Sequence, residues 1–364
     1  MSVITFLIGN GFDLACGLKS RYVDSYDEYI HSDSASESIY QFKKTIDRDI
    51  DTWADFESRL AGYAHIFKDE KELVECVRDY SSYLNSYLAR EQSAFFESFK
   101  GNDVIAFALR QAMAKGLAEF YYGLTQNDIR AVASSANRPQ GCTFQFINYN
   151  YTNVFDELVN QVFAHGALKK YSNRTFSYTP IVHIHGKLNN DIVLGVDNDT
   201  QFVDLPYQLS RRGKRNVVKP TFIEEYDNQR MKDALAQIKT SDVICVFGLA
   251  LGETDLTWRK ALAEWLVEER WHHLVFYKHS LAAKNYAATA VTLKMDDEED
   301  YKEQLLKMLF DGSLGDENRD LVYNQIHVPT GYNIFNIRET IHAARIESIQ
   351  RERAKNSRPV ENRN

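Results

Sequence analysis

Two polar residues at the ends of apolar runs, Asn150 and His185, are the strongest candidates for chemistry in this chain. An asparagine offers a donor and an acceptor together, so it can orient a ribose hydroxyl or a water molecule. A histidine is the side chain best suited to move a proton near neutral pH. The structural alternative is that Asn150 caps the helix expected from Asn153 and that His185 fills a turn before Gly186.

Three further polar residues lie near this pair in the sequence. His183 is two residues before His185, a spacing that puts both side chains on one face of a strand and would suit a metal pair. No third ligand occurs at a sensible spacing, so we expect no metal. Asn153 and Asp156 open the next helix, where capping is the expected role of at least one of them.

A strand followed by a glycine turn opens the chain. Residues 3–8 are six consecutive β-formers, and Gly9 and Gly11 follow at once. Two glycines here would let the backbone approach a pyrophosphate, and the next helix would present free N–H groups to it. The third glycine of the common dinucleotide fingerprint is replaced by Leu14, so a plain turn is the alternative.

A second glycine-bearing turn follows another apolar run and could close over the other half of a dinucleotide. Its residues are Gly248, Gly252, Thr254 and Asp255. As a turn alone it would mean little.

One basic cluster occupies residues 211–219. It consists of Arg211, Arg212, Lys214, Arg215 and Lys219. It is either a solvated loop or a group that attracts phosphates at the mouth of a crevice.

The apolar runs that end in these candidates predict one parallel sheet. They cover residues 3–9, 142–150, 181–186, 191–195, 242–248 and 271–277. The carboxyl ends of parallel strands share an edge, where open α/β folds bind ligands. We therefore expect an α/β fold with a Rossmann-type parallel sheet, and expect the candidates to meet in one crevice.

Helical periodicity interrupts this pattern and defines the expected domains. Apolar residues recur at helical spacing between residues 37 and 136, which predicts a large helical insertion. Residues 1–36 and 137–285 would form the α/β domain, and 286–364 a C-terminal, mostly helical extension. Within that extension we expect a helix over about 337–351 and a frayed end.

Composition limits the function further. The chain has 364 residues and a formal net charge of −8, which argues against general nucleic-acid binding. No stretch is long and apolar enough for a signal peptide or a membrane span, so we expect a soluble, cytoplasmic protein. The four cysteines form no Cys-x-x-Cys pair and are expected to be buried thiols.

Taken together and in order, the motifs resemble the AbiH family of bacterial phage abortive-infection proteins. The resemblance spans most of residues 3–255 and adds a helical segment to the motifs above. Its segments are Gly9 to Leu18 followed by Tyr22, Trp53-Ala-Asp55-Phe56-Glu57, Asn150-Tyr151-Thr152-Asn153, His183 to Leu188 with Leu194-Gly195, and Gly248 to Asp255.

AbiH proteins are in turn similar to the sirtuin-like NAD hydrolases of antiphage defence, which have an NAD-binding α/β domain with a helical addition. In that group an Asn-Tyr-Asp segment and a His-Gly segment supply the catalytic pair, and these correspond to Asn150 and His185. The resemblance implies that Gly9, Asn10 and Gly11 hold the pyrophosphate of NAD. The other residues that it implies for the cofactor site are Phe12, Asp13, Tyr151, Thr152, Gly186, Gly248, Gly252 and Asp255.

The resemblance therefore implies an NAD+ glycohydrolase that depletes cellular NAD during infection. A sensor that binds NAD or ADP-ribose without turnover is the second hypothesis, favoured by Thr152, which stands where the hydrolases have Asp. A nuclease-like toxin is the third, and it would need a carboxylate cluster for metal. A phage-derived trigger or a defence partner is expected in each case, and the chain could assemble into a homo-oligomer.

Overall fold

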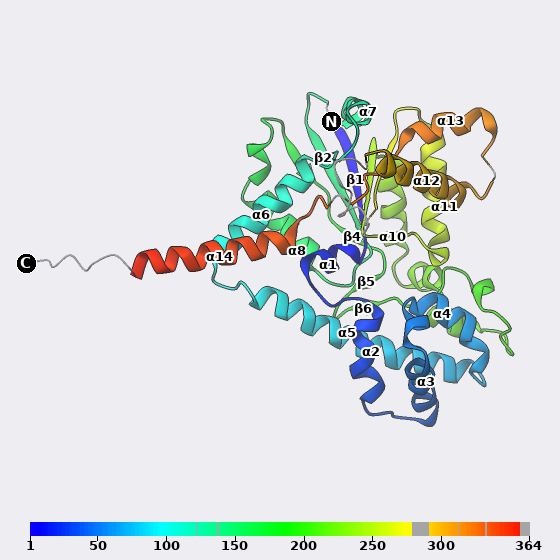
Figure 1. Cartoon of the computed structure of the whole chain (residues 1–364). Helices are drawn as coiled ribbons and strands as arrows, with labels where there is room; N and C mark the ends of the chain where they lie inside the picture. The colour runs from blue at the N-terminus through cyan, green and yellow to red at the C-terminus, as the bar shows by residue number, and fades with distance from the viewer. Residues whose placement is uncertain (122, 137, 279–290, 313, 332, 357–364) are drawn as a thin grey trace, which may run out of the picture.

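A parallel sheet of seven strands forms the centre of the computed structural model, which describes residues 1–121, 123–136, 138–278, 291–312, 314–331 and 333–356 (Figure 1). The strand order is β3-β2-β1-β7-β8-β9, and β4 also pairs with β2. The strands are β1 (Ser2–Ile8), β2 (Cys142–Asn148), β3 (Phe176–Tyr178), β4 (Val182–His183), β7 (Val243–Phe247), β8 (His273–Tyr277) and β9 (Ile326–His327).

Strand β1 lies between β2 and β7 in the sheet. The register places Ile8 beside both Asn148 and Phe247, so these three strands end at the same level. The loops that follow them therefore start side by side at one edge of the sheet. The predicted α/β fold with a parallel sheet is confirmed.

Helices cover both faces of the sheet. Alternate residues of β1 explain this, because Ile4, Phe6 and Ile8 pack into one core while Leu7 packs into another. The first face carries α1 (Gly11–Cys16), α6 (Asp103–Ala118), α7 (Gln126–Ala136), α8 (Val154–Ala164) and α14 (Ile337–Asn356). The second face carries α10 (Lys219–Lys239), α11 (Leu256–Glu268), α12 (Val291–Phe310) and α13 (Asp316–Gln325).

A third core belongs to a helical module beside the carboxyl edge of the sheet (Figure 1). Buried aromatic rings such as Trp53, Phe56 and Tyr80 dominate it. Its helices are α2 (Tyr22–His31), α3 (Glu37–Arg48), α4 (Phe56–Tyr63) and the long α5 (Glu70–Glu97). Helix α5 joins the module to the sheet, because Leu73 packs in the module core and Phe95 in a sheet core.

Helices that follow one another in the sequence pack into different cores of the protein. Helices α6 and α7 pack on the sheet, although the sequence grouped residues 37–136 together as one insertion. Helix α9 (Arg211–Val217) contacts α5, and Val217 lies in the module core. The hairpin of β5 (Gly186–Lys187) and β6 (Asp191–Ile192) follows β4, so the run 181–186 is divided between two strands.

The C-terminal segment joins the sheet as well. Strand β9 extends it beyond β8, and α14 packs on α6 before its far end leaves the body (Figure 1). The helix predicted over 337–351 is confirmed as α14. All four cysteines are buried, as expected. Within the described residues, no helix has both the length and the apolarity to cross a membrane.

Candidate functional site

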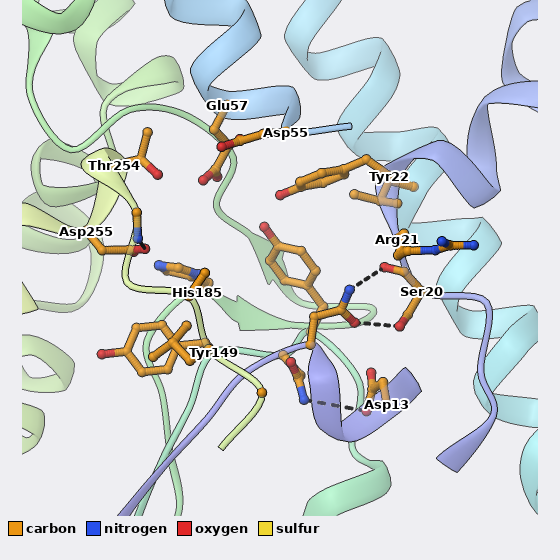
Figure 2. Close-up of a pocket in the computed structure, with 18 of the residues that line it drawn as sticks. Asp13, Ser20, Arg21, Tyr22, Asp55, Glu57, Tyr149, His185, Thr254 and Asp255 are labelled. Atoms are coloured by element: carbon orange, nitrogen blue, oxygen red, sulfur yellow. Dashed lines mark hydrogen bonds between the residues drawn. The ribbon is translucent and has the colours of Figure 1, made fainter. Parts of the chain in front are cut away.

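A cavity of about 320 Å³ opens where β1, β2 and β7 end (Figure 2). Its size is within the range of small-molecule sites. The loops after these strands form one side of it, and α2 and the start of α4 bring in residues of the helical module. The predicted crevice at the carboxyl edge of the sheet is therefore present.

Most of the residues that the sequence assigned to the catalytic pair, the cofactor site or the second glycine turn line this cavity. They are Asn10, Asp13, Asn150, Tyr151, His185, Gly248, Gly252, Thr254 and Asp255. Five others lie outside its lining. These are Gly9, Gly11, Phe12, Thr152 and Gly186.

The loop after β7 approaches the loop after β1 so closely that positions 9 and 11 must be glycine. A Cβ atom on Gly9 would lie 2.4 Å from the Gly248 carbonyl oxygen, and one on Gly11 would lie 2.4 Å from the Gly248 Cα atom. The amides of this turn are also occupied, because Gly9 N donates to Phe247 O and Gly11 N to Gly248 O, both at 2.9 Å. The two glycines therefore allow two loops to touch, which is a reason for them that needs no phosphate.

The other three residues outside the lining have structural contacts. Phe12 is fully buried among aromatic rings, including that of Phe335. Thr152 is also buried and donates a hydrogen bond to Asp13. Gly186 has φ 86° at the start of the β5–β6 hairpin, where a Cβ atom would collide with the Asp191 carbonyl oxygen.

Asp13 supports Asn150 from below the cavity (Figure 2). Its Oδ2 accepts a 2.7 Å hydrogen bond from Thr152 Oγ1, and its Oδ1 accepts from Asn150 Nδ2 at 3.5 Å. Burial raises the pKa of Asp13 to about 7, against the hydrogen bond from Thr152, which lowers it. Asn150 therefore has a titratable carboxyl behind its amide.

His183 and His185 do not share a face, contrary to the expectation from their spacing. His183 lies at the last position of β4, and the chain turns before His185. The His183 ring contacts the Asn150 carbonyl oxygen at 3.0 Å and Asp156 Oδ1 at 2.8 Å. His185 instead lines the cavity. His183 thus holds the backbone of Asn150 in place.

The capping roles expected for Asn153 and Asp156 are absent. Asn153 is the N-cap residue of α8, but its side chain makes no capping hydrogen bond. Asp156 accepts from His183, Asn148 and Lys187 instead. Burial would raise the pKa of Asp156, but the hydrogen bond and charge of His183 outweigh it, so the pKa is lowered.

His185 is a buried, neutral imidazole that faces the cavity (Figure 2). Its ring packs edge-on against Tyr149, with 5.3 Å between the ring centres. Burial lowers the pKa of His185 well below its usual value, and the positive charges of Lys219 and Arg230 add to this effect. The imidazole is therefore neutral at pH 7, which is the form that can accept a proton, while burial and the two cations disfavour the protonated form.

A buried ion pair in the cavity was not among the predicted site residues. Lys219 Nζ donates to Glu57 Oε2 at 2.5 Å, and both side chains line the cavity. Glu57 Oε1 also accepts from the backbone N–H of Gly195 at 3.3 Å. Burial raises the pKa of Glu57 to about 7, although Lys219 opposes the shift. The family segment that contains Glu57 was the signal for this residue.

Lys219 separates from the rest of the basic cluster. Residues 211–217 form helix α9 rather than a loop, and three of their four charges are paired at the surface. Arg211 and Arg215 contact Glu225, and Lys214 contacts Asp199. Lys219, at the start of α10, is the buried member.

A metal centre finds no support in the described part of the chain. No three His, Cys, Asp or Glu residues there are placed to hold a metal ion together. The site is instead a polar cavity with a neutral histidine, an asparagine amide and a buried ion pair.

Fold and site together define an α/β protein with a polar cavity at the carboxyl edge of a parallel sheet. Comparison with family models gives a match to the family described as Bacteriophage abortive infection AbiH over residues 5–277, which is more than half of the chain. The protein belongs to this family. Neither the curated proteins nor the solved structures contain a match.

Proposed function

We propose that this AbiH protein is an NAD+ glycohydrolase that cleaves the nicotinamide–ribose bond and so depletes cellular NAD during phage infection. The observation that carries the proposal is that His185 and Asn150 line one cavity at the carboxyl edge of the sheet. The family supplies the abortive-infection context.

For this reaction the protein must position the substrate and the water and accept one proton. Nicotinamide leaves with the bonding electrons, and water adds to the ribose carbon to give ADP-ribose and a proton. His185 would accept that proton from the water or from a ribose hydroxyl. Asn150 would orient the ribose and the water, and the buried end of the cavity around His185 would limit the access of other water.

The dinucleotide would extend from this pair along the cavity. Asn10 is fixed by Ser20, whose Oγ donates to Asn10 Oδ1 at 2.5 Å and whose carbonyl oxygen accepts from Asn10 Nδ2 at 3.0 Å. Arg21 lines the cavity beside Ser20 (Figure 2), and its guanidinium group, which is paired with Asp24, would turn to the phosphate when the dinucleotide binds. Because the Gly9 and Gly11 amides are hydrogen-bonded to backbone, side chains would carry this phosphate contact.

A nucleotide sensor without turnover is the second candidate. It is favoured by the Asn150 amide, whose Nδ2 faces Asp13 in the same cavity. In a sensor, Asn150 and His185 would make ground-state contacts only.

Kinetics and binding of two variants separate the candidates. In an enzyme, His185→Ala and Asn150→Ala should each lower nicotinamide release by about a hundredfold or more, with a much smaller loss of NAD affinity. In a sensor, the parent protein would release no nicotinamide and both changes would weaken binding. Addition of nucleic acid and magnesium to the same protein tests the nuclease-like alternative.

The control for this experiment is an exposed histidine. His165, at the C-terminal end of α8, is exposed, so His165→Ala should leave the rate unchanged. His183→Ala is unsuitable, because His183 contacts the Asn150 carbonyl oxygen and Asp156. Equal rates for His185→Ala and His165→Ala would refute His185 as the base.

A further inference from the structure

The two sides of the cavity differ in charge. Figure 2 shows Glu57, Thr254, Asp255 and His185 on one side, and Ser20, Arg21 and Tyr22 on the other. The first side is buried, with Glu57 7% and Asp255 9% exposed. The Arg21 side chain is 61% exposed and is bound to Asp24, so the Arg21 side faces solvent. We call the buried side, formed by Glu57, Thr254, Asp255 and Lys219, the acidic end.

The acidic end holds more negative than positive charge. Lys219 is the cation among its four residues, and its ammonium group is bound to Glu57. Asp255 is left over, and a second, half-buried carboxylate, Asp197, lies close enough to act on it and accepts from Thr257. Lys219 compensates one of these charges. Arg230, the other cation that acts on His185, is paired with Asp191 and Asp227, so the acidic end keeps a negative surplus.

Asp255 also keeps a free acceptor atom. Its Oδ2 accepts from the backbone N–H of Gly252 at 3.1 Å, and within the described ranges no hydrogen bond reaches its Oδ1. Asp255 lines the cavity on the same side as His185. Burial raises the pKa of Asp255, as is expected of a carboxylate that lacks a full set of partners. A cation placed against it would restore the balance.

We infer that the acidic end, through Asp255 and Glu57, receives the positively charged ring of oxidised nicotinamide dinucleotide and so selects it over the reduced form. The inference rests on the proposed function and adds the orientation of the substrate to it. The oxidised ring carries a positive charge and the reduced ring is neutral, whereas the rest of the molecule is the same. The phosphates then lie toward Arg21.

The same orientation fits the reaction. When the bond to nicotinamide breaks, the positive charge moves from the ring to the ribose, which becomes oxocarbenium-like. Carboxylates beside the ring and the ribose therefore stabilise the positive charge both before and during cleavage of the bond. Asp255 is a specificity-determining residue in this assignment, and His185 remains the base.

The test is a binding measurement that does not depend on turnover. Carbocyclic NAD+, which has a carbon ring in place of the ribose and resists hydrolysis, and its reduced form are titrated into the full-length protein by calorimetry. The oxidised form should bind about tenfold more tightly or better, the size expected for one charge contact in a partly buried site.

Two variants assign the preference to the charge. Asp255→Asn keeps an acceptor for Gly252 N but removes the charge, so it should reduce the preference by about tenfold, mainly through weaker binding of the oxidised form. Asp233→Asn is the matched control, because it makes the same change of charge at an exposed aspartate outside the cavity lining. Its preference should equal that of the parent protein.

Each outcome decides a different point. Equal binding of the two forms by the parent protein would overturn this inference and leave the proposed function standing. A preference that survives in Asp255→Asn would overturn the role of Asp255. Failure of both forms to bind would overturn the proposed function and this inference with it.

Discussion

At the scale of a single residue, Asp13 makes the stability of the folded protein depend on pH. Its side chain is buried beneath Asn150 and is hydrogen-bonded by Thr152. Its pKa of about 7 in the folded protein is above the value of 3.8 expected in an unfolded chain. Between these values the folded state holds a proton that the unfolded state has lost. The contribution of Asp13 to stability is therefore present below about pH 4 and is lost as the pH rises to 7.

Asp13→Asn should remove this dependence, because the amide has the shape of the carboxyl and no charge. The free energy of unfolding of the variant, relative to the parent, should rise by about 1 kcal/mol or more between pH 5 and pH 7. Urea denaturation at both pH values measures it. Parallel pH profiles for the two proteins would mean that Asp13 is already ionised in the folded state.

The Glu57–Lys219 pair is the second prediction at this scale. Both side chains are buried, so Lys219→Met alone should cost about 3–5 kcal/mol in the free energy of unfolding, because it leaves a buried carboxylate unpaired. Glu57→Gln/Lys219→Met should recover much of that loss, since the glutamine still accepts from Gly195 N. A double-mutant cycle by denaturation measures the coupling, and additive losses would show that the pair is not coupled.

At the scale of elements, the site depends on two loops whose backbones touch, the loop after β1 and the loop after β7. Because the Gly11 Cα region touches Gly248, Gly11→Ala should destabilise the protein by about 1–3 kcal/mol through overpacking. Gly62→Ala in α4 is the control, because a Cβ atom there meets nothing within 4 Å, and it should be neutral or slightly stabilising. Thermal denaturation compares the two. Equal melting temperatures would show that the loops are not packed as described.

The elements also show what the sequence could and could not predict. Strands β1, β2, β7 and β8 were predicted because buried parallel strands are continuous apolar runs with a polar or glycine end. The sequence could not distinguish Lys219 from its four charged neighbours, which lie on the surface, because only the start of α10 buries it. The opposite directions of His183 and His185 depend on the end of β4, which strand periodicity cannot reveal.

At the scale of the whole molecule, the C-terminal segment completes the core. Phe335 is fully buried, and its ring packs at 5.5 Å from that of Phe12 and 5.2 Å from that of Phe247. It therefore lies against both glycine-bearing loops. The sequence pattern beyond residue 282 was weak, because β9 is only two residues long and its partner in the sheet lies about fifty residues earlier.

Phe335→Ala should consequently cost about 3–5 kcal/mol in the free energy of unfolding and loosen both loops. Phe107→Ala, at a phenylalanine that is 57% exposed on α6, should change stability by less than about 1 kcal/mol. Chemical denaturation measures both. Similar losses for the two variants would mean that the C-terminal segment is not part of the core.

The measurement that tests the account most directly is release of nicotinamide from NAD+ by the pure parent protein. The proposed enzyme should produce free nicotinamide and ADP-ribose in equal amounts, and His185→Ala should produce both about a hundredfold more slowly. Binding of NAD+ without any release of nicotinamide, in the parent protein as in the variant, would contradict the proposed activity.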